Sequence, residues 1–385
     1  MINFDFANEC YQCGNCKNIC PQNAIQYIKN EAADNIPVID KKKCVNCGLC
    51  DKVCPRIKAK GTNEILTAFA AHGNDSLSLK RSASGGVFWT IAKKFIENGG
   101  YVCGCVFQQN LQAEHILSNS LDDLIRMQGT KYVKSNTEKV LSDIDKKLQQ
   151  GNKILFCGTP CQVSAIEKRF AKYREQLYLI GLFCHGVPSQ KVLDVYVEWL
   201  EKENKKKVKN VIFRSKNHPQ KEHEIIFTDD TRKFYYINNS KYMNYFFGNV
   251  VSNSCMDQNC QYKNNFCGDL MIGDAWGYKG VLTKNFNDRI SYILCLSQKG
   301  INLIDIADMT LESIDYTDII RNQPYLLHGV KQNVARNEIM CELNKHNFQK
   351  LIYKYKLSSR TRDFAYKIGL YPIVSKIKKF INGRK

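Results

Sequence analysis

The sequence predicts a small α+β module at the N-terminus and, after it, a larger α/β body with a partly parallel sheet. Two observations lead to this prediction: a cysteine pattern that occurs twice before residue 60, and alternating strand and helix patterns beyond it. A chain of 385 residues suits two or three domains rather than one compact core. We expect the module over residues 1–60, a body in two parts over 61–145 and 146–330, and a basic, largely helical tail over 331–385.

Composition narrows the class of protein. No apolar run approaches the roughly 18 to 20 residues that span a bilayer, and the first residues lack the basic start and apolar stretch of an export signal. We therefore expect a cytoplasmic protein. Eighteen cysteines in such a chain indicate metal ligation or redox chemistry rather than a disulfide framework.

The formal charge of +19 suggests an anionic partner. Much of this charge is local, because residues 350–385 hold eleven Lys or Arg and a single acid, Asp363. A charged tail explains the balance at least as well as a nucleic-acid-binding body does, so we do not expect nucleic acid as the partner. The alternative is a sulfur-rich scaffold or an RNA-binding protein, whose binding to nucleic acid would depend strongly on salt.

Two cysteine runs share one spacing. Residues 10–21 read Cys-x2-Cys-x2-Cys-x3-Cys-Pro, and residues 44–55 repeat this order. In the bacterial ferredoxin pattern, three thiolates of a run hold one 4Fe-4S cluster and the fourth ligates the other cluster. We therefore assign Cys10, Cys13, Cys16 and Cys54 to one cluster, and Cys44, Cys47, Cys50 and Cys20 to the second. Zinc also binds four cysteines, but two runs with this spacing and a following proline exceed what zinc needs.

Beyond residue 61 the pattern is that of strands and helices in alternation. An apolar strand over residues 66–71 precedes the loop Ser82-Ala83-Ser84-Gly85-Gly86, and apolar residues at helical spacing follow over 88–95. Gly99-Gly100 ends this helix. A Ser/Gly loop that leads into a helix offers free N–H groups and a positive dipole end to a phosphate. Such loops often only cap a helix, so this signal is weak by itself.

A β-α-β unit follows. A strand over residues 153–156 leads through Cys161 into a helix, and a second strand over 177–183 ends at Cys184. This alternation predicts a parallel pair with a right-handed crossover, so both cysteines would emerge at the same edge of the sheet. Ligands of open α/β sheets bind at that edge.

A third group of cysteines occurs farther along the chain. Cys255, Cys260 and Cys267, taken together with Cys161 and Cys184, give five candidate thiolates for one further 4Fe-4S cluster. Which four of them would serve is open. The alternative is that these residues are buried small hydrophobes, since free cysteine is among the most buried residue types.

Six short stretches of the body are distinctive, and their order along the chain adds to their significance. They are Ser82–Gly86, Gln128–Ser135, Leu155–Gln162, Cys184–Ser189, Phe213-Arg214 and Ile272–Gly277. Over roughly residues 1–330 the chain resembles the family of beta subunits of coenzyme F420 hydrogenases and dehydrogenases, which includes the 7-hydroxymethyl chlorophyll a reductase of plastids. The resemblance implies that the central α/β domain holds FAD, which would exchange electrons with the clusters and a hydride with a substrate or deazaflavin.

The same resemblance implies where the flavin binds. The candidates are Ser82, Ser84, Gly85, Gly86, Gly129, Thr130, Lys131, Tyr132, Gly158 and Thr159. Lys131 would be the cation beside a pyrophosphate or a reduced flavin ring; otherwise it is a solvated surface lysine. His185 would be a catalytic proton donor at the flavin edge, or else a neighbour that caps a helix.

Some positions depart from the family pattern. Cys157 stands where members often carry Ser, and Cys103 and Cys105 fall in a strand that usually lacks cysteine. We interpret these three, with Cys295 and Cys341, as packing residues. The pair Cys255-x4-Cys260 replaces the usual C-x-x-C pair, which leaves the geometry of a third cluster open.

The sequence therefore favours an iron-sulfur flavoprotein oxidoreductase that passes electrons between a ferredoxin-type donor, or another redox protein, and a small-molecule substrate or deazaflavin through FAD. The alternative is an electron-transfer subunit that serves a separate catalytic partner.

At the end of the tail, residues 373–381 form an apolar stripe opposite lysines. Such a helix suits peripheral contact with an anionic membrane or packing on its own domain.

Overall fold

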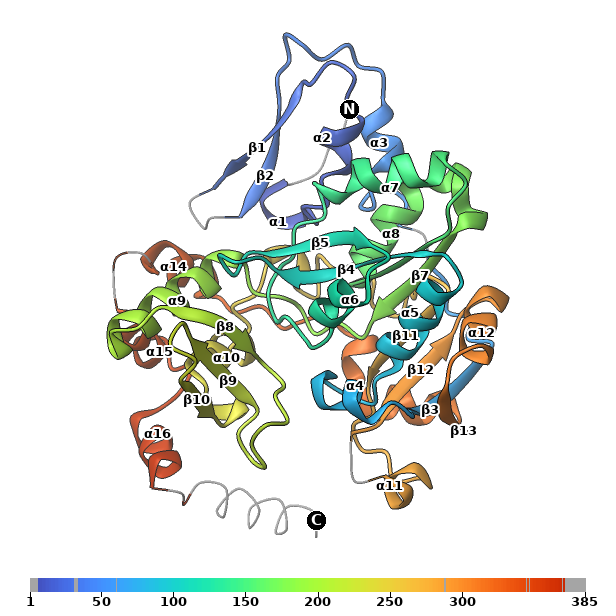
Figure 1. Ribbon diagram of the computed structural model, residues 1–385. Helices are drawn as coiled ribbons and strands as arrows, with labels where there is room; N and C mark the ends of the chain where they lie inside the picture. Colours follow the sequence, from blue (N-terminus) through green and yellow to red (C-terminus); the bar gives the residue numbers. More distant parts are fainter. Residues whose placement is uncertain are drawn as a thin grey trace.

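The computed structural model describes residues 6–30, 34–59, 61–286, 289–343, 345, 347–368 and 370. Three layers of structure lie beside one another: an N-terminal module, a large central sheet, and a smaller second sheet with its own helices (Figure 1). Among the helices of the described ranges, none is both long and apolar enough to cross a membrane.

The N-terminal module is a hairpin with short helices. Its elements are α1 (Phe6–Glu9), α2 (Asn15–Ile19), β1 (Ile25–Lys29), β2 (Asn35–Ile39) and α3 (Leu49–Val53). The two strands pair antiparallel. Both α2 and α3 begin after a glycine with positive φ, Gly14 at 84° and Gly48 at 72°, a conformation that side chains other than glycine rarely adopt. At Gly14 a Cβ would also lie 2.8 Å from the Glu138 Cβ, so this glycine lets the module approach the body closely.

The body is built on an eight-stranded sheet of order β13-β3-β12-β11-β7-β6-β4-β5. The strands are β3 (Thr67–Gly73), β4 (Tyr101–Phe107), β5 (Ala113–Ser118), β6 (Ile154–Gly158), β7 (Leu177–Leu182), β11 (Leu270–Asp274), β12 (Ser291–Cys295) and β13 (Met309–Ser313). The inner strands β4, β6, β7 and β11 are parallel, and the outer pairs are antiparallel. The predicted mixed α/β body with a partly parallel sheet is confirmed, including the parallel pair over 153–156 and 177–183.

Helices cover both faces of this sheet. They are α4 (Ser76–Arg81), α5 (Val87–Glu97), α6 (Leu121–Met127), α7 (Val140–Gln149), α8 (Pro160–Arg169), α11 (Leu282–Asn285), α12 (Gln298–Asp305) and α13 (Tyr316–Asn322), with the 3-10 turns η1 (Ala171–Gln176) and η4 (Pro324–Leu326). Leu155 and Cys157 of β6 pack with α5 and α12, whereas Ile154 and Phe156 pack with α7 and α8. Because successive side chains of a strand point to opposite faces, a strand buried on both faces is apolar throughout.

The second sheet is an antiparallel meander of order β10-β9-β8. Its strands are β8 (Val208–Ile212), β9 (His223–Phe227) and β10 (Arg232–Tyr235); the helices of this layer are α9 (Gln190–Asn204), η2 (Ile237–Asn239), α10 (Lys241–Phe247), η3 (Asn253–Cys255), α14 (Arg336–Glu342), α15 (Phe348–Lys354) and α16 (Arg360–Lys367). Ile339, Phe348 and Ile352 of the predicted tail lie in the core of this layer. The described part of the tail is therefore largely helical, and α14 and α15 are part of a folded core. The apolar stripe over 373–381 lies outside the described residues.

The N-terminal module docks firmly on the body. Asp34 and Arg336 form an ion pair at 2.7 Å, with side chains only 1% and 2% exposed. The Tyr262 hydroxyl donates to the Pro55 carbonyl at 2.8 Å, and the Asn15 amide donates to the Ala165 carbonyl at 2.7 Å. Buried polar contacts of this kind cost free energy when one partner is removed, so they fix the module in one orientation.

Candidate functional site

The eight cysteines of the module fall into two sets, each around its own small cavity. The inner set is Cys10, Cys13, Cys16 and Cys54, and the outer set is Cys20, Cys44, Cys47 and Cys50. Each set therefore takes three thiols from one run and the fourth from the other run. This is the crossed grouping that the spacing predicts.

The crossing arises from the ends of two short helices. Cys20 follows α2 and Cys54 follows α3, and both adopt extended backbone conformations with ψ of 111° and 120°. Each of these cysteines precedes a proline, and the residue before a proline is restricted to extended conformations. The chain therefore leaves the helix at the fourth cysteine, and its thiol joins the other set.

A zinc ion would need about four ligands that converge to roughly 2.3 Å from one point. Within the ranges that the structure describes, no group of three or more His, Cys, Asp or Glu side chains is arranged around a single metal ion in this way. Both cysteine sets instead surround a space. This arrangement suits a cluster with several iron atoms.

The two sets differ in their surroundings. Cys13, Cys16 and Cys54 are buried, whereas Cys47 of the outer set is exposed. Thr137 of the body donates to the Cys13 carbonyl at 3.0 Å, so the inner set faces the body. Burial raises the pKa of Cys10 to about 12 and that of Cys16 to about 11, and such thiols release their protons when metal binds.

The third group of cysteines gathers in front of the central sheet. Cys161 lies at the start of α8 after β6, and Cys184 follows β7, so both emerge at the carboxyl ends of parallel strands. Electrostatic interactions join all pairs among Cys161, Cys184, Cys255 and Cys260. Gly186 has a φ of 81° and a Cβ placed there would lie 3.4 Å from the Cys255 Cβ. This glycine brings the Cys184 loop close to Cys255.

Cys267 is arranged differently from these four. It is buried, and its thiol donates a hydrogen bond to the Pro160 carbonyl at 3.1 Å. Burial raises the pKa of Cys267 well above its usual value. Of the five predicted candidates, Cys161, Cys184, Cys255 and Cys260 each interact with the other three, whereas Cys267 interacts with Cys161 and Cys260 and is hydrogen-bonded within the fold.

Lys134 interacts with two of the cysteine sets, and the sequence analysis did not single it out. Its ammonium interacts electrostatically with Cys161 and Cys255 of the third group and with Cys10 and Cys13 of the inner set. Burial lowers the pKa of Lys134, but the interactions with these cysteines outweigh burial and raise it above the usual value. The signal was present, since Lys134 belongs to the stretch Gln128–Ser135 that carries the family resemblance.

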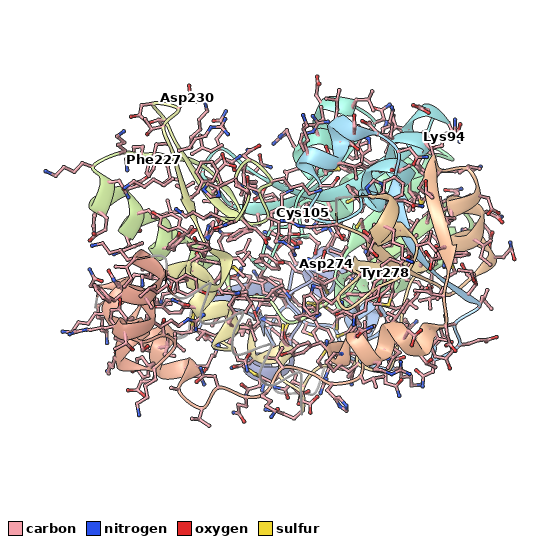
Figure 2. All side chains as sticks on the ribbon, turned by 90° about the horizontal axis from the view of Figure 1, so that it is seen from below. Lys94, Cys105, Phe227, Asp230, Asp274 and Tyr278 are labelled. Carbon is pink, nitrogen blue, oxygen red and sulfur yellow. The ribbon has the colours of Figure 1, made fainter. Side chains whose placement is uncertain are left out.

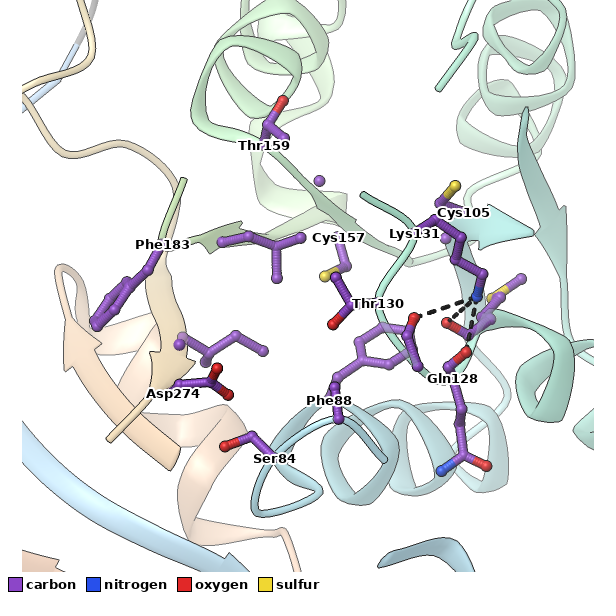
Figure 3. Close-up of a pocket in the computed structure, with 18 of the residues that line it drawn as sticks. Ser84, Phe88, Cys105, Gln128, Thr130, Lys131, Cys157, Thr159, Phe183 and Asp274 are labelled. Atoms are coloured by element: carbon purple, nitrogen blue, oxygen red, sulfur yellow. Dashed lines mark hydrogen bonds between the residues drawn. The ribbon is translucent and has the colours of Figure 1, made fainter. Parts of the chain in front are cut away.

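A cavity of about 260 Å³ opens at the carboxyl ends of β6, β7 and β11. Nine of the ten predicted flavin-binding residues line it: Ser82, Ser84, Gly86, Gly129, Thr130, Lys131, Tyr132, Gly158 and Thr159. Figure 3 shows Ser84, Thr130, Thr159 and Asp274 around this space. Cys105 and Asp274 also line the cavity. In Figure 2 they are seen near the middle of the molecule, with Phe227 of β9 on one side and Lys94 of α5 on the other.

Gly85 is the exception among the predicted residues. It does not line the cavity; its N–H donates to the Ser291 hydroxyl at 2.9 Å. A Cβ at this position would lie 2.5 Å from the Ala71 carbonyl oxygen and 2.8 Å from the Ser291 nitrogen. Gly85 therefore serves the packing of the loop on β3 and β12.

Lys131 lines the cavity, but its ammonium is engaged elsewhere. It donates to the carbonyls of Arg126, Met127, Gln128 and Gly129 at 2.8 to 3.3 Å (Figure 3). These carbonyls belong to the end of α6, where a cation is favourable. Burial lowers the pKa of Lys131 to about 8. The Lys131 ammonium thus caps the end of the helix that forms one wall of the cavity.

His185 also lines the cavity. Its ring lies between Trp276 and Tyr325, with centroid distances of 4.8 Å to each. Burial lowers the pKa of His185 to about 4, so the ring is neutral near pH 7. Its Nε2 has no hydrogen-bond partner among the described residues.

Two cysteines that the sequence analysis interprets as packing residues, Cys105 and Cys157, line the cavity. Cys103 and Cys295 are buried packing residues as predicted. Burial raises the pKa of Cys157 to about 12, so its thiol stays protonated. His115 lies beside Cys157 and contacts its carbonyl at 3.1 Å through Nε2.

An ion-pair network borders the cavity. Arg214 binds Asp274 at 2.6 Å and Glu222 at 2.9 Å, and Arg289 binds Glu222 at 3.1 Å. Arg214 and Asp274 belong to two of the stretches that carry the family resemblance, so the sequence contained their signal but not their pairing.

Comparisons with known proteins agree with these features. Residues 6–59 match the family model of the 4Fe-4S dicluster domain, and residues 151–318 match that of the C terminus of the beta subunit of coenzyme F420 hydrogenase/dehydrogenase. A subunit of the F(420)H(2) dehydrogenase of Methanosarcina mazei is 26% identical over 200 residues, which are 48% of this chain and 57% of that protein. The chain thus spans little more than half the length of this relative.

A solved structure was also matched. A chain of the F420-reducing NiFe hydrogenase complex from Methanosarcina barkeri has a TM-score of 0.43 and 16% identity, over 76% of this chain and 92% of that chain. The family resemblance predicted from the sequence is confirmed by the two family models and the curated relative. Residues 6–59 thus match a 4Fe-4S dicluster domain, and residues 151–318 match the C-terminal part of the beta subunits of coenzyme F420 hydrogenase/dehydrogenase.

Proposed function

We propose that this chain is an iron-sulfur flavoprotein oxidoreductase in which electrons pass from the ferredoxin-like module, through a third cluster, to FAD in the central cavity and then to a substrate. One segment supports this proposal most directly. Thr137 binds the Cys13 loop of the inner set, Lys134 interacts with that set and with the third group, and Tyr132 lines the cavity. Residues 132–137 therefore run past the inner set, the third group and the central cavity.

The residues of the cavity fit a flavin. The helix α5 begins at its wall with Gly86, and no side chain caps its first turn. Free N–H groups and the helix dipole at such an end favour a phosphate. Gly86 and Gly129 line the cavity with positive φ, a backbone conformation that glycine adopts without steric cost. Apolar side chains such as Val87 and Ile272 supply walls for a ring.

The chain's own residues would then bind and shield this group. A flavin bound there would take up electrons singly from the third cluster and deliver them to a substrate in pairs. The neutral His185 offers an uncharged nitrogen at the edge of the cavity, because burial holds its pKa near 4. Protonated Cys157 and the apolar walls would exclude water. Cys161, Cys184, Cys255 and Cys260 would hold the third cluster, and the two sets of the module would hold the other two.

The outer set is the proposed entry point for electrons. Cys47 is exposed, and the three lysines Lys41, Lys42 and Lys43 that precede the second run are exposed as well. An acidic redox protein, such as a ferredoxin, would complement this surface. The rate of reduction by such a donor should fall as ionic strength rises.

Anaerobic purification followed by iron and flavin assays tests the proposal. At four irons per cluster we expect about twelve irons, together with FAD released on denaturation. About eight irons and no flavin would contradict both the third cluster and the flavoprotein assignment. Turnover of the isolated chain with reduced ferredoxin, with and without coenzyme F420 as the acceptor, then tests the deazaflavin.

The second candidate is an electron-transfer subunit that serves a separate catalytic partner. The curated relative supports it, because that protein is named as one subunit of a dehydrogenase. In this case the chain would contain the same centres but would reduce a substrate only when a second subunit is added. Reconstitution with candidate partner subunits separates the two functions.

A further inference from the structure

The helix α16 carries large apolar side chains on its outward surface. Phe364 is 62% exposed, and Ile368, which directly follows the helix, is 49% exposed. Residues four positions apart lie on the same face of a helix, so these two side chains form one apolar stripe. Leu370, the last residue that the structure describes, is 51% exposed. Single exposed apolar residues are common, but three within seven residues indicate a contact surface.

The opposite face of α16 is fixed to the second layer of the fold. Tyr366 is buried and packs on Tyr236 with a centroid distance of 5.2 Å. Asp363 forms an ion pair with Lys241, and both side chains are only 14% exposed. These contacts hold the helix in one orientation, so the apolar stripe stays at the surface of the molecule.

Basic side chains border the apolar stripe. Arg360 begins the helix and Lys367 ends it, and both are exposed. Seven residues are nearly two helical turns, so the two cations lie along the same flank of the stripe. The surrounding sequence has the same sign of charge, because residues 350–385 hold eleven Lys or Arg and no acid besides the inward Asp363. The partner of this surface should therefore be both anionic and apolar.

An anionic lipid bilayer meets both requirements. Amphipathic segments of this kind place apolar side chains at the boundary between headgroups and acyl chains, while lysines and arginines bind the anionic headgroups. Two or three side chains cover far less than the roughly 800 Å² on each side that a specific protein interface buries. A few apolar side chains together with several cations are enough for reversible binding to a membrane surface.

The position of α16 in the molecule suits such a contact. Figure 1 shows α16 at the margin of the second layer, on the side of the molecule away from the N-terminal module. A bilayer that contacts α16 would therefore leave the module and its exposed Cys47 in water.

We propose that α16 docks the protein on an anionic lipid surface, with Phe364 and Ile368 inserted between the headgroups and with Arg360 and Lys367 bound to the phosphates. This membrane contact is separate from the proposed electron transfer and does not depend on a flavin or on a third cluster.

Vesicle flotation with the full chain tests the proposal. We expect the protein to float with vesicles of equal parts phosphatidylcholine and phosphatidylglycerol and to remain unbound with vesicles of phosphatidylcholine alone. Binding should weaken as salt rises, because salt screens the attraction between the cations and the headgroups. No flotation with the anionic vesicles, or equal flotation with both kinds, would overturn the proposal.

Variants of the apolar stripe separate α16 from the rest of the basic tail. Phe364→Ser combined with Ile368→Ser should raise the dissociation constant for anionic vesicles at least about tenfold, because both side chains then leave the headgroup region. The control combines Leu77→Ser with Val281→Ser, two apolar residues of the body that are 66% and 55% exposed, and should bind like the parent chain. If the stripe variant floats as well as the control, α16 is not the docking surface.

A second pair of variants tests the charge of the surface. Arg360→Gln combined with Lys367→Gln should raise the dissociation constant for anionic vesicles about tenfold and make binding less sensitive to salt. Lys202→Gln combined with Lys205→Gln removes two exposed cations at the end of α9 and should leave binding unchanged. Equal loss of binding in both pairs would mean that net charge, and not the surface of α16, attracts the protein to the vesicles.

Discussion

The chain builds its two kinds of cysteine site in different ways. The eight thiols of the module come from two runs within residues 10–54, and short helices place them. The four thiols favoured for the third cluster come from the ends of β6 and β7 and from a distant loop over 255–260. A local site is encoded by spacing, whereas a distributed site exists only when the sheet has assembled. Each prediction below tests this difference.

The largest effect should follow from Cys184→Ser. This thiol interacts with the other three of its set, so its loss should remove one cluster, about four of twelve irons. The two clusters of the module should remain, because their ligands are local. Iron assay and low-temperature electron paramagnetic resonance measure this result. Loss of all three clusters would show that the module depends on the distributed site.

A complementary variant removes a local ligand. Cys20→Ser takes the fourth thiol from the outer set only, so the outer cluster should be lost while the third cluster stays. Reduction by an external donor should then slow greatly, since the outer set is the exposed one. An unchanged rate with a protein donor would contradict the proposed entry point.

The difference between the sites also explains what the sequence could predict. The spacing of the two cysteine runs was sufficient to predict the crossed sets. Apolar patterns were sufficient to predict the strands β3, β6 and β7 and the helix α5. The second sheet was not predicted, because β8 to β10 are short strands whose polar residues, such as Lys209 and Arg232, obscure the alternation. Its core also needs α14 and α15, which lie more than a hundred residues away along the chain.

The candidate site shows the same limit. Nine residues that the sequence singles out line one cavity, since they lie in loops that follow strands or lead into helices. The sequence could not show that the Lys131 ammonium binds the end of α6, because that contact depends on how the chain turns after the helix. Nor could it separate Cys267 from Cys260, which differ only in where their thiols point after folding.

The ion pair that docks the module should show the next largest effect. Arg336→Met leaves Asp34 buried without its partner, which should destabilise the docked arrangement by about 3–5 kcal/mol. The module should retain its clusters, while electron transfer from the inner set to the third cluster should slow. Stopped-flow reduction measures the transfer. The double variant Asp34→Asn with Arg336→Met should recover much of the loss, because no buried charge is then unpaired.

Lys134 tests whether the local and distributed sites share an electrostatic environment. Lys134→Met removes a positive charge that interacts with the inner set and with the third group. A cation near a cluster stabilises the reduced, more negative state, so both midpoint potentials should fall, by about 60 mV for each 1.4 kcal/mol of lost interaction. Lys202→Met is the matched control, since Lys202 is exposed and lies on α9, which holds none of the assigned cysteines. A shift confined to one cluster would place the lysine beside that cluster alone.

The smallest effect should come from Cys267→Ala. The thiol of Cys267 donates to the Pro160 carbonyl, so it is already committed to a contact within the fold. Its removal should cost about 1 kcal/mol of stability through the lost hydrogen bond, while iron content and cluster spectra should stay as in the parent chain. Because Cys267 lies near Cys161 and Cys260, it is the strictest control for the four assigned ligands. A loss of about four irons here would mean that the distributed site uses Cys267 in place of one of them.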